Sequence, residues 1–138
     1  MSGVVRFGVS LDSDLLQNFD KHIKVKKYTN RSEAIRDLIR EELIKQEWQE
    51  NKEVTGAIVL VYNHHKRELA NWLIDVQHHY FNCILSSQHI HLDEDNCLEI
   101  IAVYGIAERI KELYEKLKAK KGVKHTSFTE ATTGKKVD

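Results

Sequence analysis

The sequence contains no proline, only two cysteines and no long run of apolar residues. Two cysteines cannot build a disulfide framework, and a helix that spans a bilayer needs about 20 mostly apolar residues in succession. Lysine plus arginine and aspartate plus glutamate are equal at 21 each, so no charge excess advertises a nucleic-acid or membrane partner. The first residues, MSGVVRFGVS, lack the apolar core of a signal peptide. We therefore expect a cytoplasmic protein without a membrane segment.

The 138-residue chain divides at the polar stretch QENKEVTG, and we expect domains over residues 1–51 and 52–138. The first begins with VVRFGVSLD, whose alternating apolar residues are typical of a half-buried strand. A helical pattern follows with Asp12 as its cap, and Asn30 with Glu33 forms a capping box for a second helix. In the second domain the expected strands are 54–62, 83–92, 97–104 and 123–129, and the expected helices are 66–80 and 106–120. Their βαββαβ order is the ferredoxin-like plan.

The N-terminal domain is a poor monomer, because one strand has no ladder partner and about fifty residues bury too little surface. A dimer that pairs the strand with its two-fold copy gives a two-stranded ribbon over four helices, which is the ribbon-helix-helix plan. Such a ribbon fits the major groove of double-stranded DNA. We expect Arg6, Gly8 and Ser10 to face the bases, and Arg6 can contact guanine through two hydrogen bonds.

Phosphate contacts are expected from the second helix and the turn before it. The amides at Asn30, Arg31 and Ser32 open that helix and can anchor a phosphate. Lys27 belongs to a basic run without an acid, which consists of Lys21, Lys24, Lys26, Lys27 and Arg31. The alternative is that these are ordinary exposed polar residues, but the topology and the basic run together favour DNA contact.

The stretch HIHLDEDNC gathers candidate metal ligands around one acidic turn. His89 and His91 are two apart in a strand and share a face. A five-residue loop over 92–96 places Cys97 opposite His91, whereas a four-residue loop pairs Leu92 with Cys97 and turns the thiol away. His78 or His79, from the same chain or a neighbour, can supply a fourth ligand. Such nitrogen and sulfur donors suit tetrahedral zinc or a planar Ni(II) or Cu(II) site, while an isolated H-x-H is often only two polar strand residues.

Five segments in order carry a family resemblance: NRSEAIRDLIR, VYNHHKRELA, QHH, HIHLDEDNCLE and GVKH. They closely resemble the NikR-type nickel-responsive transcriptional regulators over residues 4–128. The resemblance implies an α+β protein with a ribbon-helix-helix DNA-binding domain joined to a ferredoxin-like (ACT-like) domain. It also implies a homotetramer, a dimer of dimers, that binds operator DNA when Ni(II) is bound and represses nickel-uptake genes.

The same resemblance implies roles for individual residues. The nickel ligands would be His89, His91 and Cys97 of one subunit and His78 of a neighbour, in a planar site with one Ni(II) per subunit. His79 then lies outside the ligand set. Glu99 looks like an orienting partner for a ligand imidazole. Glu33 and Asp37, four apart on a helix, correspond to carboxylates of an alkali-metal site between the domains, although an exposed acidic pair is an equal alternative.

Other features keep alternatives open. The family commonly carries a hydroxyl residue where this chain has Gly8, so the operator sequence does not transfer. His64, His65 and His125 are expected to be solvated surface residues, and Cys83 has no assigned role. The competing functions are an amino-acid-binding ACT-type regulator, a regulator that senses zinc or copper, and a zinc hydrolase. A hydrolase needs an open coordination position, which four protein ligands do not leave.

Overall fold

The structure is a computed structural model that describes residues 3–138. The chain forms two compact units, one that ends at Ile39 and one that runs from Arg40 to Asp138. Helix α2 (Arg31–Gln49) continues from the first unit into the second. The domain boundary predicted at residue 51 stays a prediction. No helix among residues 3–138 is long and apolar enough to cross a bilayer.

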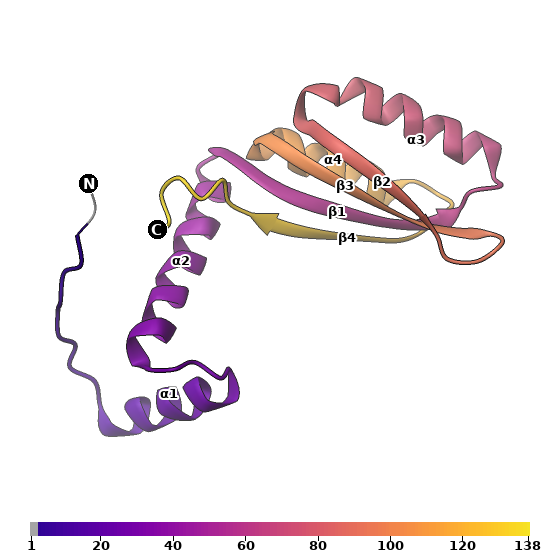
Figure 1. Ribbon diagram of the computed structural model, residues 1–138. Helices are drawn as coiled ribbons and strands as arrows, with labels where there is room; N and C mark the ends of the chain where they lie inside the picture. Colours follow the sequence, from indigo (N-terminus) through magenta and orange to yellow (C-terminus); the bar gives the residue numbers. More distant parts are fainter. Residues whose placement is uncertain (1–2) are drawn as a thin grey trace. The chain divides into compact units, whose positions relative to one another are not determined.

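The first unit opens with an elongated segment, residues 3–12, followed by α1 (Ser13–Val25) (Figure 1). The segment forms no ladder with any described part of this chain, so the strand predicted there and its pairing with a second copy stay predictions. Its apolar side chains are exposed, with Val5 at 84% and Phe7 at 71%. Asp12 is the N-cap residue of α1 as predicted, but its side chain makes no capping hydrogen bond, and its backbone carbonyl accepts Leu16 N at 3.0 Å.

Helix α1 ends in a Schellman motif. Tyr28 N donates to Ile23 O at 3.1 Å and Lys27 N donates to Lys24 O at 3.2 Å. Lys27 takes the left-handed position of this motif with φ 61°, where glycine is the usual residue. Helix α2 then begins as predicted, with Asn30 Oδ1 accepting Glu33 N at 2.9 Å. The reciprocal half of the capping box is not observed, since Glu33 Oε1 instead accepts Arg36 at 2.7 Å.

The second unit is a four-stranded antiparallel sheet with strand order β2-β3-β1-β4. Its strands are β1 (Glu53–Asn63), β2 (Ile84–His91), β3 (Asn96–Ile106) and β4 (Val123–Ala131). Its helices are α3 (Arg67–His79) and α4 (Ala107–Ala119), with a short 3₁₀ turn at Phe81–Cys83. The predicted βαββαβ order is confirmed, and both helices cover the same face of the sheet (Figure 1).

The core lies between that face and the two helices. Alternate residues of the central strands are buried, including Ile58 and Leu60 on β1 and Ile101 on β3, with the alternation broken only at Gly56 and Gly105. These side chains join the apolar stripes of α3 and α4, in which Leu73 and Leu113 are almost completely buried. The alternation in the strands and the 3.6-residue period in the helices therefore meet in one hydrophobic cluster.

The connection from α2 to β1 also fixes the start of α4. Asn51, at φ 58°, ends α2 in a second Schellman motif in which Lys52 N donates to Glu47 O at 2.9 Å. The Asn51 side-chain oxygen accepts Glu108 N at 2.7 Å, and Lys52 O accepts Ala107 N at 3.0 Å. Two of the unpaired amides at the N-terminus of α4 are thereby satisfied by the connection.

Candidate metal centre and DNA-binding segment

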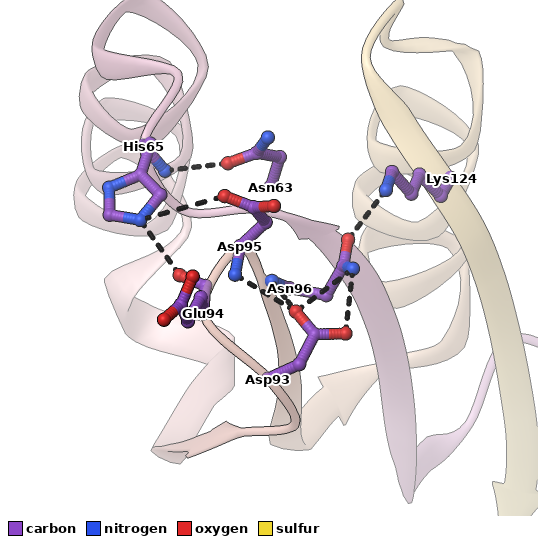
Figure 2. A network of polar contacts seen from close by, with 7 residues as sticks. All are labelled: Asn63, His65, Asp93, Glu94, Asp95, Asn96 and Lys124. Carbon is purple, nitrogen blue, oxygen red and sulfur yellow. Dashed lines mark hydrogen bonds and ion pairs between the residues drawn. The ribbon is translucent and has the colours of Figure 1, made fainter.

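The turn between β2 and β3 sets the register of the candidate metal ligands. His91 pairs with Cys97 and His89 pairs with Glu99, so the predicted five-residue connection is confirmed. Asp93 shapes the turn: its Oδ1 accepts the backbone N–H groups of Asp95 at 2.9 Å and Asn96 at 2.7 Å (Figure 2). This Asx turn brings the ends of β2 and β3 into the required alignment.

Cys97 lies between two aromatic neighbours on adjacent strands. It pairs with His91 of β2 on one side and with Tyr62 of β1 on the other. The alternation of β3 puts Cys97 and Glu99 on the helix-covered face, and both are buried. His89 and His91, opposite these two residues, therefore share that face at the edge of the sheet.

Glu99 is a fully buried carboxylate held by three side chains from three elements. Tyr62 OH on β1 donates to Oε1 at 2.8 Å, and Gln77 Nε2 on α3 donates to Oε2 at 2.5 Å. His89 Nε2 lies 3.5 Å from Oε2, so the predicted role of Glu99 beside a ligand imidazole fits this position. A buried carboxylate is tolerable because both of its oxygens have donors. Sequence reasoning missed Tyr62 and Gln77.

The hydroxyl of Tyr62 keeps its proton in this environment. Burial raises the pKa of Tyr62 far above its usual range, and its hydrogen bonds to Glu99 and Cys97 raise it further. The hydroxyl oxygen also lies 3.4 Å from His89 Nδ1. The Tyr62 hydroxyl, which stays protonated, thus connects β3, which carries Cys97, with β2, which carries His89.

A cavity of about 420 Å³ opens beside this network, between α3 and β2. Its polar lining consists of Tyr62, Gln77, His78, Ser87, His89 and Glu99. The two histidines at the end of α3 differ in their position relative to the cavity. His78 lines it, whereas His79 does not and instead packs edge-on against Tyr80 with ring centroids 5.2 Å apart.

The single chain does not bring the four predicted ligands together. Among residues 3–138, no three His, Cys, Asp or Glu side chains are grouped so that they could hold a metal ion. The imidazoles have other neighbours: His89 faces Glu99, and the ring of His91 lies 4.7 Å from that of His64 between centroids. The set His78, His89, His91 and Cys97 therefore stays a prediction, although its donors suit nickel chemically.

A polar network surrounds the tip of the β2–β3 turn (Figure 2). His65 Nε2 lies 2.7 Å from Glu94 O and 3.9 Å from Asp95 Oδ1. Lys124 of β4 donates to Asn96 Oδ1 at 2.5 Å. Within the described chain, His64 Nε2 is buried without a hydrogen-bond partner. His65 and His125 are exposed, as expected, and His65 also braces the turn. The expectation of a solvated surface residue is wrong for His64, whose Nε2 is buried.

The predicted second cation site is a pair of carboxylates with separate partners. Glu33 binds Arg36, and Asp37 Oδ2 accepts the Tyr28 hydroxyl at 2.7 Å. Both residues lie on the same face of α2, as their spacing requires. The site stays a prediction.

The candidate DNA-contacting residues lie in the first unit. Arg6, Gly8 and Ser10 belong to the exposed segment 3–12. Arg31 makes a two-bond ion pair with Asp20 of α1, at 2.9 and 3.0 Å, and this guanidinium lowers the pKa of Asp20. Asn30 caps α2, while Lys27 and Ser32 are exposed at the turn and the first helical residues. Their DNA contacts stay predictions.

Two family models cover most of the chain. The family described as the NikR C terminal nickel binding domain matches residues 55–131, and the ribbon-helix-helix protein family of the copG type matches residues 5–46. A solved structure, an uncharacterized protein from Thermotoga maritima, covers 57% of this chain and 98% of its own, with a TM-score of 0.52 at 14% identity. That likeness shows the fold alone.

Full-length relatives extend the match. A candidate nickel-responsive regulator of Syntrophus aciditrophicus is 58% identical over 134 residues, which is 97% of this chain and 98% of the relative. Another of Pyrococcus furiosus is 50% identical over 136 residues, covering 98% and 99%. Both units of the structure lie within these alignments. The chain belongs to the family of nickel-responsive regulators that join a ribbon-helix-helix domain to a NikR C-terminal domain.

Proposed function

We propose that this protein is a nickel-responsive transcriptional regulator and not an enzyme. Its first unit binds double-stranded operator DNA, and its second unit binds nickel. The observation that carries the proposal is the strand register that sets His91 opposite Cys97 and His89 opposite the buried Glu99. A thiolate ligand requires a reducing compartment, so the proposed location is the cytoplasm.

The proposed ligands are His89, His91 and Cys97 of one subunit and His78 of a neighbour. The first three share one face of neighbouring strands, and His78 is exposed at the end of α3, where it can reach another chain. This arrangement requires at least two chains, and we propose a homotetramer, built as a dimer of dimers, with one Ni(II) per subunit. When bound, nickel supplies a dication that prefers planar nitrogen and sulfur coordination.

The protein's own contribution is to hold the ligands in place. Glu99 is fixed by Tyr62 and Gln77, and its Oε2 lies 3.5 Å from His89 Nε2. In the proposed loaded site this carboxylate would orient the His89 ring toward the metal. The register of the turn keeps the Cys97 thiol beside His91. The proposed alkali-metal site at Glu33 and Asp37 would lie on α2, the helix that continues into the second unit.

Regulation follows from differential binding. Nickel can increase DNA affinity only if it binds the DNA-competent arrangement of subunits more tightly than the others. The proposed competent arrangement lets two ribbon-helix-helix dimers engage two operator half-sites together, which represses nickel-uptake genes.

The decisive experiment compares Cys97→Ala with Cys83→Ala. Cys97→Ala should remove the sulfur-to-nickel absorption band, most of the nickel affinity and the nickel-dependent DNA binding. Cys83 is buried elsewhere, with its Sγ donating to Tyr80 O at 3.4 Å, so Cys83→Ala should keep all three. Unchanged nickel affinity in Cys97→Ala would refute the assignment. Bound metal without visible absorption would indicate zinc instead, because zinc has a filled d shell.

A mixing experiment tests whether the site is shared. Neither His78→Ala nor Cys97→Ala subunits can form a complete site alone. Mixed assemblies should regain some nickel binding, since one chain then supplies His78 to a neighbour that retains Cys97. Mixed assemblies that recover no nickel binding would show that His78 does not act in a neighbouring subunit.

A further inference from the structure

The C-terminal residues 132–138 follow β4 and lie along the second half of α2. Hydrogen bonds hold the two segments together at both ends. Trp48 Nε1 donates to Ala131 O at 2.9 Å, and Thr132 Oγ1 donates to Glu47 Oε1 at 2.8 Å. Arg40 Nε donates to Val137 O at 3.0 Å. From Arg40 to Trp48 the helix rises by about 12 Å, so the segment spans about two turns of α2.

The Thr132 hydroxyl takes part in two hydrogen bonds in this segment. Its hydroxyl donates to Glu47 and also accepts Gly134 N at 3.1 Å, which uses both the donor and an acceptor position of the group. Gly134 has φ +82°, a left-handed conformation that side-chain-bearing residues rarely adopt. One hydroxyl therefore both attaches the segment to α2 and shapes the turn that directs it along the helix.

The segment lies over a cavity rather than in the hydrophobic core. The cavity measures about 500 Å³ and lies between the segment, α2 and the start of β1. Its lining carries charges of both signs. Glu47, Glu50, Lys52 and Glu53 come from α2 and the start of β1, and Lys135 and Lys136 come from the C-terminal segment. Polar contacts over a cavity give low local stability, so the segment can detach without unfolding the sheet.

The contacts between residues 132–138 and α2 lie at two informative positions in the chain. Arg40 is the first residue of the second unit, at the point where α2 arrives from the first unit. Ala131 pairs with Thr55 at one end of β1, and the other end of β1 carries Tyr62 beside Cys97. The central strand thus connects the candidate metal centre to the place where the C-terminal segment is attached.

We propose that residues 132–138 act as a strap that holds α2 around Arg40 on the second unit and thereby transmits nickel binding to the DNA-binding unit. The inference rests on the proposed function, because it concerns regulation by the same nickel site. Without the strap, Ile44 and Trp48 still pack on the core and keep the end of α2 attached. When the strap is detached, the turn of α2 that begins at Arg40 loses its attachment to the second unit. The helix then no longer moves together with the sheet.

The test compares the full-length protein with a chain that ends at Ala131 and with Thr132→Val and Thr132→Ser. The DNA probe is a duplex selected from a random pool by nickel-loaded wild-type protein. We expect the shortened chain and Thr132→Val to keep nickel affinity but to lose at least about tenfold of the nickel-induced gain in DNA affinity. Thr132→Ser retains the hydroxyl and should behave as wild type. Amide exchange at residues 40–43 should accelerate in the first two variants only.

Each outcome decides the matter. A full nickel-induced gain in Thr132→Val and in the shortened chain overturns the strap. If the shortened chain fails to fold or to bind nickel, Thr132→Val decides alone, with Thr132→Ser as its control. Faster exchange at residues 40–43 with loss of the gain supports the strap. A wild-type protein that binds nickel without any change in DNA affinity overturns the proposed function itself, whatever the variants do.

Discussion

The two units bury their apolar side chains in different ways. In the described part of the first unit, Ile23 and Ala34 are the buried residues, while Val5, Phe7 and Val9 are 61–84% exposed. In the second, the sheet and two helices enclose a continuous hydrophobic cluster. A single chain therefore encloses the core of the second unit but leaves the apolar side chains of segment 3–12 exposed.

This difference explains why DNA binding and assembly belong together. Burying a Val or Phe side chain gains about 1.5–3 kcal/mol, so an exposed apolar row favours pairing with a second copy. In the proposed ribbon, Arg6, Gly8 and Ser10 are predicted to face outward, on the side opposite the apolar row. The second unit encloses its core within one chain, although Ile74, Phe81 and Leu85 on its surface are 56–72% exposed.

The largest expected effect is loss of the ribbon in Phe7→Asp. A charge in the apolar row should prevent pairing of the two segments and abolish DNA binding, because an unpaired carboxylate cannot be buried cheaply. Ser10→Ala, on the other side of the segment, is the matched control and should keep the assembly. Light scattering measures the assembly of both variants, and DNA titration measures their DNA affinity. Unchanged assembly and DNA affinity in Phe7→Asp would refute the pairing.

Next in size is a cavity in the core of the second unit. Leu113→Ala should cost about 2–5 kcal/mol in the free energy of unfolding, since the side chain is completely buried on α4. Leu92→Ala changes the same side chain where it is 54% exposed and should cost much less. Urea unfolding at two protein concentrations checks the comparison. A loss for Leu113→Ala that depends on concentration would show that this core is not complete within one chain.

A smaller effect separates base contacts from phosphate contacts in the first unit. Arg6→Ala should lower specific DNA affinity by about 1–3 kcal/mol. Lys27→Gly should weaken binding to all sequences and flatten the salt dependence, while the left-handed position accepts glycine without strain. Titrations at several salt concentrations distinguish the two. Equal losses on selected and unrelated DNA for Arg6→Ala would exclude base reading.

Much of the fold could be predicted from local patterns. Alternation and helical periods gave the element order of the second unit, and the loop length needed by Cys97 is the observed one. Tyr62 and Gln77 escaped prediction because they meet Glu99 only after β1 and α3 pack together. The role of Asp93 was accessible, since Asp three residues before Asn at a turn favours an Asx turn. The C-terminal segment has no period that could reveal its contact with α2.

The smallest expected effect concerns the ion pair between α1 and α2. The Arg31 guanidinium holds the pKa of Asp20 below its usual value, through a hydrogen bond first and charge second. A carboxyl group whose pKa is lower in the folded state stabilises the fold above its ordinary pKa of about 4, and this contribution disappears as the pH falls through the lowered value. Both side chains are largely exposed, at 58% and 41%, so the effect is small.

Acid titration can detect this pair in the intact protein. In wild type, the Arg31 Nε–H signal in an NMR spectrum should move as Asp20 is protonated below about pH 4. Asp20→Asn cannot be ionised, so the same signal should stay constant over that range. The variant also leaves Arg31 available for a phosphate, which should slightly strengthen DNA binding at low salt and not at high salt. If wild type and Asp20→Asn titrate alike and bind DNA alike, the pair between Asp20 and Arg31 is not formed in solution.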